Sequence, residues 1–127
     1  MKKKILVVDD SKTALFIVTT ILKRAPYELV VAHDGQQALE VAASERPDLI
    51  LMDVVMPRKT GFEACRELKQ REDTKNIPVI LVTTRGEEEN IKTGFESGCN
   101  DYITKPVNAQ ELLAKVRDHI AGFGVRR

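Results

Sequence analysis

The sequence predicts an α/β fold of three layers (αβα), in which helices cover both faces of an open parallel sheet. Five short apolar runs recur along the chain, and segments with helical periodicity separate them. Strict alternation of strands and helices implies parallel strands joined by right-handed crossovers. Five strands are too few to close a TIM barrel, so we expect the five βα units to form an open sheet.

The strands are predicted from short runs that are rich in Val and Ile and lack polar alternation. Such runs are typical of strands that are buried on both faces of a sheet. The predicted strands comprise residues 5–8, 28–32, 49–52, 78–82 and 102–104.

The helices are predicted from apolar residues at the three- and four-residue spacing of an amphipathic helix. These positions are Ala14, Leu15, Val18, Ile21 and Leu22, then Ala38, Leu39 and Ala42, then Phe62, Cys65 and Leu68, then Ile91 and Phe95, and finally Leu112, Leu113, Val116 and Ile120. Four of the helices begin near a residue suited to cap a helix N-terminus, and Pro falls between elements at positions 26, 47 and 78. The capping candidates are Ser11, Asp34, Thr60 and Asn108.

The composition describes one soluble domain and excludes several classes of protein. The 127 residues are 43% hydrophobic, and 20 basic against 19 acidic side chains give a net charge of +1, which argues against a dedicated nucleic-acid binder. The longest apolar run, residues 14–18, is too short to span a membrane, and no signal peptide is evident. Cys65 and Cys99 lack the spacing of a zinc or redox motif. We therefore expect a single cytoplasmic domain over residues 1–127 with no membrane contact.

Three carboxylates fall at the carboxyl ends of two predicted strands: Asp9 and Asp10 follow the first strand, and Asp53 follows the third. An open doubly wound sheet binds ligands beyond these strand ends, where the strand order reverses. In the flavodoxin-like order 2-1-3-4-5, which we adopt from known sheets, the first and third strands are neighbours. The three side chains should therefore converge in one crevice. Asp10 or Ser11 would also suit the cap of the first helix.

Clustered carboxylates repel one another and need a compensating charge. Mg²⁺ suits them because it takes oxygen ligands and keeps part of its water, and Mn²⁺ fits the same ligands. The fourth strand ends in Thr83 and the fifth leads to Lys105, which adds a hydroxyl and an ammonium to the crevice. These are the parts needed to move a phosphoryl group onto a carboxylate. Neither a Walker loop nor a GxGxxG motif is present.

Five short motifs follow one another in the sequence. They read VVDD at residues 7–10, LILMDVVMP at 49–57, TGF at 60–62, VTT at 82–84 and KP at 105–106. Together they resemble the response-regulator receiver domains of bacterial two-component signalling, especially the single-domain chemotaxis regulators, over about residues 4–120. The resemblance implies that Asp53 accepts a phosphoryl group from a sensor histidine kinase, a histidine phosphotransfer protein or a small phosphodonor. It also implies a switch that catalyses only its own phosphorylation and dephosphorylation.

The resemblance assigns the metal ligands as well. Asp10 would bind Mg²⁺ directly and Asp9 through water. The Asp53 carboxylate and the backbone carbonyl of Val55 would be the remaining Mg²⁺ ligands from the protein. Val55 and Arg85 occupy the positions that tune dephosphorylation, and the apolar Val55 predicts a long-lived phosphate because it cannot orient water.

The remaining roles concern the phosphoryl group and its readout. Lys105 would pair with phosphoryl oxygens, and its bond to Pro106 would be cis. Thr83 would hydrogen-bond the phosphoryl group, while Thr84 would narrow access to it. Tyr102 would turn inward when Thr83 shifts, which changes a surface formed by residues 87–121.

The partners implied are a phosphodonor protein and either a downstream target or a fused output domain, with no nucleic acid. The chain would act as a monomer or as a phosphorylation-dependent dimer. The first helix is where kinases dock in relatives, and Phe16 and Ile17 are expected to be partly exposed there. His33 and His119 lack any partner pattern, so we expect both at the surface.

Other functions remain open on the sequence alone. A Mg²⁺-dependent hydrolase would use the same carboxylates, but it would need an acid two residues after Asp53, where Val55 stands. A cofactor binder of the same fold is disfavoured by carboxylates where an anionic phosphate would dock. A receiver that has lost phosphorylation is disfavoured by the intact set of site residues.

Overall fold

The computed structural model of the chain describes residues 2–84 and 88–122, with side chains for 2–84 and 92–122. In these residues five strands and five helices alternate, as predicted. The elements are β1 (Lys4–Val8), α1 (Lys12–Leu22), β2 (Glu28–Ala32), α2 (Gly35–Glu45), β3 (Leu49–Asp53), α3 (Gly61–Gln70), β4 (Val79–Thr84), α4 (Glu88–Glu96), β5 (Asp101–Lys105) and α5 (Ala109–Ile120).

The strands form one parallel sheet in the order β2-β1-β3-β4-β5, which confirms the flavodoxin-like order. β1 and β3 are neighbours, with Val8 opposite Met52. β3, β4 and β5 end one to two residues beyond the predicted apolar runs, because the polar residues at their ends still take part in strand pairing. Their carboxyl ends therefore lie at the same edge of the sheet as the residues that follow β1.

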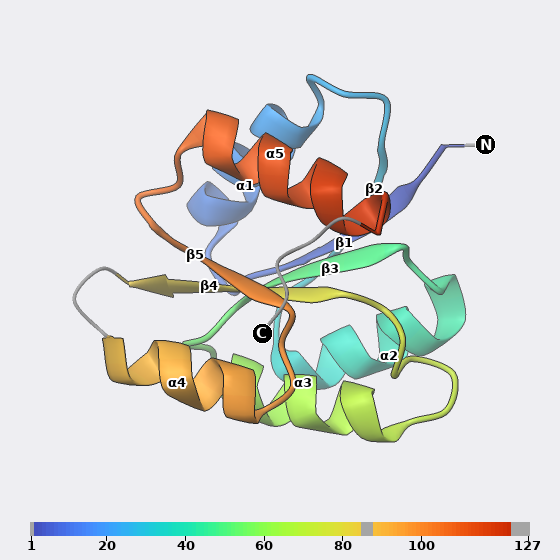
Figure 1. Cartoon of the computed structure of the whole chain (residues 1–127), viewed down its shortest axis with the longest axis vertical. Helices are drawn as coiled ribbons and strands as arrows, with labels where there is room; N and C mark the ends of the chain where they lie inside the picture. Colours follow the sequence, from blue (N-terminus) through green and yellow to red (C-terminus); the bar gives the residue numbers. More distant parts are fainter. Residues whose placement is uncertain (1, 85–87, 123–127) are drawn as a thin grey trace.

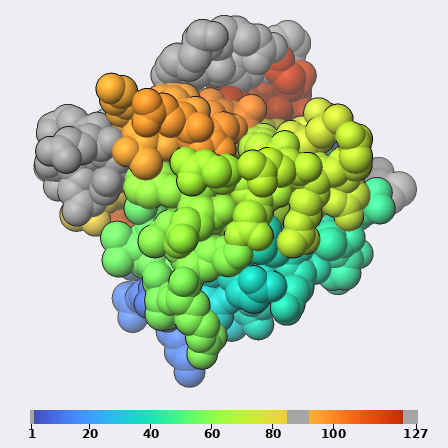
Figure 2. All heavy atoms as spheres, turned by 90° about the horizontal axis from the view of Figure 1, so that it is seen from below, coloured from blue at the N-terminus to red at the C-terminus, as the bar shows by residue number. Residues whose placement is uncertain are grey.

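Helices cover both faces of the sheet, so the fold has three layers (Figure 1). α1 and α5 lie on one face, and α2, α3 and α4 lie on the other, where they form a continuous surface with α3 in the middle (Figure 2). Alternate residues of each strand enter the two cores: Ile5 and Val7 face α1 and α5, whereas Leu6 and Val8 face the other side. No helix in the described part of the chain is long and apolar enough to cross a membrane.

All four predicted capping residues begin helices. The side-chain oxygens of Ser11, Asp34, Thr60 and Asn108 accept hydrogen bonds from backbone N–H groups in the first turns of α1, α2, α3 and α5. Thr60 and Glu63 also form a reciprocal capping box at the start of α3. Because Ser11 caps α1, the alternative role of Asp10 as the cap is wrong, and its carboxylate is not used in that way.

Candidate functional site

Three carboxylates converge at the carboxyl ends of β1 and β3. One oxygen from each of Asp9, Asp10 and Asp53 lies within 4.8 Å of the others. Asp9 and Asp53 are buried, while Asp10 is exposed to solvent. Pairing of β1 with β3 produces this arrangement, because it places the loop after Val8 beside the last residue of β3. The convergence predicted from the strand ends is therefore present.

Among the side chains that the structure describes, Lys105 supplies the positive charge that pairs with these acids. Its Nζ lies 3.1 Å from Oδ1 of Asp53 and 3.3 Å from Oδ2 of Asp9. Burial alone would lower the pKa of Lys105, but its bonds to these carboxylates raise the pKa above the ordinary value. Lys105 therefore stays protonated and is shared between the two buried acids.

One ammonium does not neutralise the cluster. Burial, followed by the charge of Asp9, raises the pKa of Asp53 from 3.8 to about 6, and Lys105 offsets this only in part. The cluster is therefore costly to ionise without a further cation. Three carboxylate oxygens grouped in this way are hard oxygen donors, which are the ligands that Mg²⁺ and Mn²⁺ prefer. The residues present thus fit a small divalent cation.

Two contacts fix the acids in place. Oδ1 of Asp9 accepts a hydrogen bond from the backbone N–H of Ser11 at 3.0 Å, which ties the carboxylate to the start of α1. Gly61 packs against the backbone of Asp53, and a Cβ at this glycine would lie only 2.4 Å from the Asp53 carbonyl oxygen. Sequence reasoning used Gly61 as part of a motif but missed this role, because the contact depends on the path of the preceding loop.

The predicted phosphate-binding residues lie along the same edge. Thr83 is buried at the end of β4, where its backbone is opposite Thr104 of β5, and Thr84 is exposed beyond it. The Lys105–Pro106 peptide bond is cis, which is the geometry that the resemblance implied.

Tyr102 lies near the start of β5, three residues before Lys105. Its ring is half-buried and meets Phe95 of α4 edge to face, with centroids 6.1 Å apart. The site thus contains Thr83 near the acids and, on the next strand, an aromatic side chain in contact with α4.

The resemblance assigned Val55 and Arg85 to the tuning of dephosphorylation, and the structure describes only the first of them. Val55 lies two residues after Asp53, beyond the end of β3, and is 65% exposed, so its apolar side chain faces solvent. Arg85 lies outside the described residues, and so does residue 87 at the start of the predicted readout surface.

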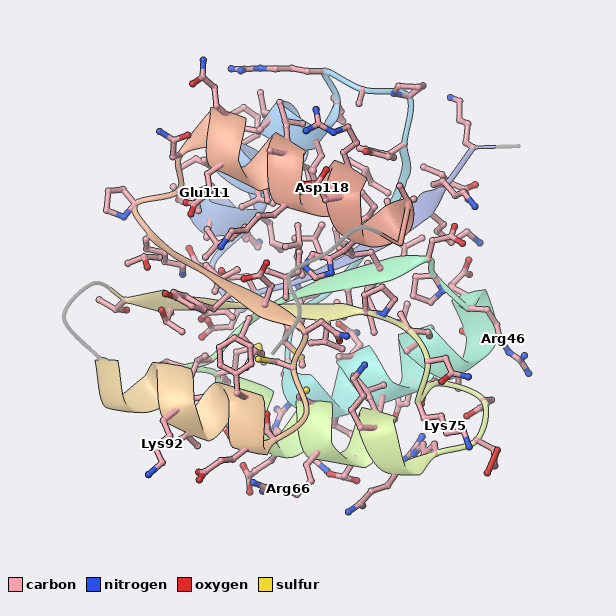
Figure 3. All side chains as sticks on the ribbon, viewed as in Figure 1. Arg46, Arg66, Lys75, Lys92, Glu111 and Asp118 are labelled. Atoms are coloured by element: carbon pink, nitrogen blue, oxygen red, sulfur yellow. The ribbon has the colours of Figure 1, made fainter. Side chains whose placement is uncertain are left out.

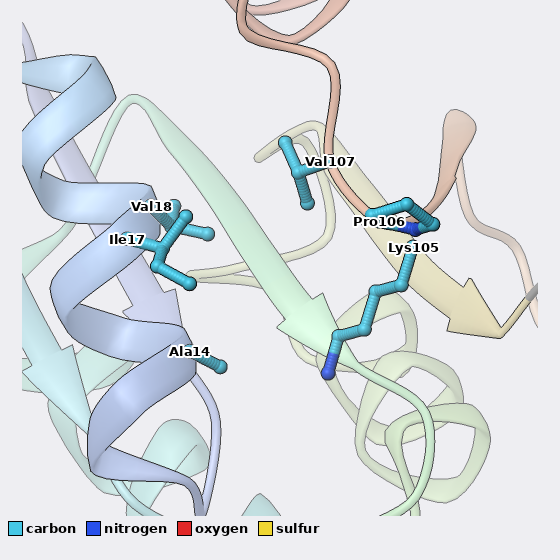
Figure 4. A pocket seen from close by; sticks show the side chains of 6 residues that line it. All are labelled: Ala14, Ile17, Val18, Lys105, Pro106 and Val107. Atoms are coloured by element: carbon cyan, nitrogen blue, oxygen red, sulfur yellow. The ribbon is translucent and has the colours of Figure 1, made fainter.

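A cavity of about 330 Å³ opens beside Lys105, between α1 and the segment after β5 (Figure 4). Its lining is mainly apolar and comprises Ala14, Ile17, Val18, Lys105, Pro106 and Val107. Phe16 and Ile17 are exposed by 72% and 48%, as predicted for this helix. An apolar surface thus adjoins the end of the sheet where the acids converge.

The prediction that His119 lies at the surface is wrong, whereas His33 is exposed as expected. The His119 side chain is only 6% exposed, and its Nε2 lies 3.0 Å from Oδ2 of Asp101. Sequence reasoning missed this pairing because Asp101 belongs to β5. The available signal was the four-residue spacing of Lys115 and His119, which places both on one face of α5.

Comparison with known proteins gives a consistent result. The sequence model of the response regulator receiver domain matches residues 5–117. Protein PilH of Pseudomonas aeruginosa is 40% identical over 119 residues, which cover 94% of this chain and 98% of PilH. The chain spans about half the length of three transcriptional regulators that it also matches.

Two solved structures are also similar. The chemotaxis response regulator CheY4 of Vibrio cholerae is 34% identical with a TM-score of 0.86, and the match covers 94% of this chain and 99% of CheY4. The receiver domain of the sensor histidine kinase PA1611 from Pseudomonas aeruginosa is 29% identical with a TM-score of 0.88, over 95% of this chain and 99% of that one. The PA1611 structure has a magnesium ion coordinated in its active site cleft.

Proposed function

Since the chain belongs to the response regulator receiver domain family, we propose that it is a signalling switch in which Asp53 accepts the phosphoryl group. Receiver domains act in two-component signalling and are switches rather than classical enzymes. The observation that carries the proposal is the convergence of Asp9, Asp10 and Asp53 beside the ammonium of Lys105. A nucleophilic carboxylate and a fixed positive charge at one strand edge suit phosphoryl transfer.

Asp53 has the properties of the nucleophile. It lies at the end of β3, and Lys105 keeps one of its oxygens in an ion pair. In the transfer, a carboxylate oxygen forms a bond to phosphorus while the bond from phosphorus to the donor's histidine nitrogen breaks. The electron pair of that bond goes to the imidazole. Lys105 remains in place to bind the negative charge of the transferred group.

Asp9, Asp10, Asp53 and the backbone carbonyl of Val55 would hold Mg²⁺, or Mn²⁺ in its place. The cation would supply positive charge that offsets the carboxylates and the phosphoryl oxygens. The grouping of three carboxylate oxygens and the raised pKa of Asp53 support this assignment.

The phosphoryl group adds about 1.5 to 2 negative charges at Asp53. Its oxygens would attract the hydroxyl of Thr83 and the ammonium of Lys105, and Tyr102 would move into the space that Thr83 leaves. This shifts the population of two existing arrangements and alters the surface of α4, β5 and α5. Thr84 would narrow the approach to the phosphoryl group, and Val55 and Arg85 would set its lifetime.

We assign the donor as a histidine kinase or a histidine phosphotransfer protein, and the recipient as a downstream protein or a fused output domain. The exposed Phe16 and Ile17 and the adjoining cavity suit contact with the donor. Residues 1–127 act as one receiver domain, either as a monomer or as a dimer formed after phosphorylation. The free and buried Cys65 and Cys99 suit the reducing cytoplasm.

The hydrolase alternative is less well supported. It needs an acid and base beside the nucleophile, yet the residue two positions after Asp53 is the exposed and apolar Val55. Incubation with acetyl phosphate, with and without Mg²⁺, tests the two functions. A receiver gains one phosphoryl group in the intact mass, whereas a hydrolase releases phosphate from external esters over many turnovers without retaining it.

A further inference from the structure

Besides Asp9 and Asp53, a further carboxylate is buried away from the acidic site, at the first residue of β5. Asp101 is 1% exposed, and both of its oxygens are engaged. Oδ1 accepts from the backbone N–H of Tyr102 at 2.8 Å and lies 3.1 Å from Nζ of Lys115, while Oδ2 lies 3.0 Å from Nε2 of His119. We call Asp101, Lys115 and His119 the Asp101 cluster.

Lys115 joins this cluster to the neighbouring aromatic side chain. Its Nζ donates to the backbone carbonyl of Tyr102 at 2.8 Å and lies 5.0 Å from the centroid of the Tyr102 ring. On the solvent side it also lies 3.6 Å from Oε2 of Glu111, near the start of α5 (Figure 3). The same ammonium therefore contacts the Asp101 carboxylate and both the backbone and the ring of Tyr102.

Burial and hydrogen bonding together fix the charge of Asp101 and the position of Lys115. Burial alone would raise the pKa of Asp101, but hydrogen bonds from His119, Tyr102 and Lys115 hold the pKa below its usual value. The carboxylate is therefore ionised and fixes the position of Lys115. His119 occupies Oδ2, which leaves Oδ1 to Lys115, so both α5 residues are needed to satisfy a carboxylate that water does not reach.

We propose that the Asp101 cluster holds Tyr102 in its present position and thereby sets how readily phosphorylation at Asp53 shifts the switch. Lys115 is the positioning residue, and Asp101 and His119 fix it in place. The inference rests on the proposed function, because it takes Asp53 as the phosphoacceptor and Tyr102 as the moving aromatic. A contact made in only one of two arrangements favours that arrangement by the free energy of the contact.

Loss of the Lys115 ammonium should favour the phosphorylated arrangement. A cation–π contact at a partly exposed site changes such an equilibrium about two- to fivefold. Lys115→Met keeps the aliphatic chain and removes the charge. The concentration of a phosphoryl analogue that shifts half of the molecules should therefore fall by this factor. Asp101→Asn removes the anchor of Lys115 and should act in the same direction. Lys115→Arg keeps the charge and should restore the midpoint of the unsubstituted protein.

The chain offers a direct reporter of Tyr102. It contains two tyrosines and no tryptophan, so in a Tyr27→Phe background the tyrosine emission comes from Tyr102 alone. The experiment titrates beryllium trifluoride with Mg²⁺ and records this emission. In parallel, fluorine NMR counts the fluoride groups bound at Asp53. Lys92→Met is the matched control, because Lys92 is an exposed residue of α4 that points away from the sheet (Figure 3).

The expected result is a lower midpoint for Lys115→Met and Asp101→Asn, and an unchanged midpoint for Lys115→Arg and Lys92→Met. Equal midpoints for Lys115→Met and the parent, with fluoride bound at Asp53 in both, would overturn the role of the cluster and leave the proposed function intact. Absence of bound fluoride in the parent would overturn both. Thermal melting of each variant verifies that it is folded, and Asp101→Asn provides an independent test of the same prediction.

Discussion

Lys105 at the end of β5 reaches past β4 to Asp53 at the end of β3, and their charged atoms lie 3.1 Å apart. The same ammonium also forms an ion pair with Asp9, whose Oδ2 lies 3.3 Å from Nζ. A single positive charge thus stabilises two buried carboxylates, while the nearby Asp10 adds a third negative charge. This imbalance adds to the effect of burial in raising the pKa of Asp53.

The first prediction concerns stability and pH without metal. The pKa of Asp53 is about 6 in the folded chain against an ordinary value of 3.8, so the unfolded chain loses this proton first as the pH rises. The contribution of Asp53 to stability therefore falls between pH 4 and 6, by up to about 3 kcal/mol. Asp53→Asn should stabilise the metal-free protein at pH 7.5 much more than at pH 4. Urea unfolding in EDTA measures the difference, and an equal effect at both pH values would contradict the assignment.

The second prediction concerns Mg²⁺. A cation that binds the ionised cluster stabilises the folded state by mass action. Addition of Mg²⁺ should therefore raise the melting temperature more at pH 7.5 than at pH 5, and Asp10→Asn should weaken the effect. Asp118→Asn changes a carboxylate near the end of α5 that does not belong to the group of Asp9, Asp10 and Asp53, and it is the control (Figure 3). A rise of similar size in the Asp10 and Asp118 variants would show that the cation binds elsewhere.

The third prediction concerns Lys105. Lys105→Met removes the charge that faces Asp53 and Asp9, and it should slow phosphorylation by acetyl phosphate about 10²-fold, as expected for loss of an electrostatic stabiliser. Quenched time points analysed by intact mass give the rate. Lys92→Met is the matched substitution at an exposed position of α4, and a comparable loss of rate there would argue against a specific role of Lys105.

The fourth prediction concerns the lifetime of the phosphoryl group. Val55 is 65% exposed, so Val55→Asn should leave the fold unchanged while it provides a polar group that can orient water. The variant should lose its phosphoryl group faster than the parent. The decay of the phosphorylated mass after removal of the donor measures this, and an unchanged half-life would refute the role given to Val55.

The fifth prediction concerns Gly61. Gly61→Ala would place a Cβ 2.4 Å from the Asp53 carbonyl oxygen, so the loop or the end of β3 must move. Overpacking of this kind costs about 1–3 kcal/mol. Urea unfolding should show this loss, together with slower phosphorylation because Asp53 is displaced. A variant of unchanged stability and rate would mean that the loop moves freely.

The sequence predicted the positions of the site residues well because they lie at strand ends. Asp9, Asp53, Thr83 and Lys105 follow apolar runs, and the carboxyl ends of parallel strands share one edge. Ser11 was recognisable as a cap because its partner lies only three residues away. Local sequence patterns were therefore sufficient to predict the fold and the positions of these site residues.

The features that were missed depend on contacts between distant elements. His119 pairs with Asp101 across 18 residues, and the register of α5 on β5 cannot be read from spacing within either element. The role of Gly61 depends on the loop after β3, in which Arg58 adopts a positive φ of 68°. The ends of β3 and β5 were placed too early because polar residues continue the strand pairing there.

We propose that Asp53 accepts the phosphoryl group in a Mg²⁺-dependent reaction. The most direct test is peptide mapping by mass spectrometry after incubation with acetyl phosphate, with Mg²⁺ or with EDTA, beside an Asp53→Asn variant. We expect one phosphoryl group per chain, located at Asp53, that is absent in EDTA and in the variant. A phosphoryl group at another residue, or none on a folded chain in the presence of Mg²⁺, would contradict it.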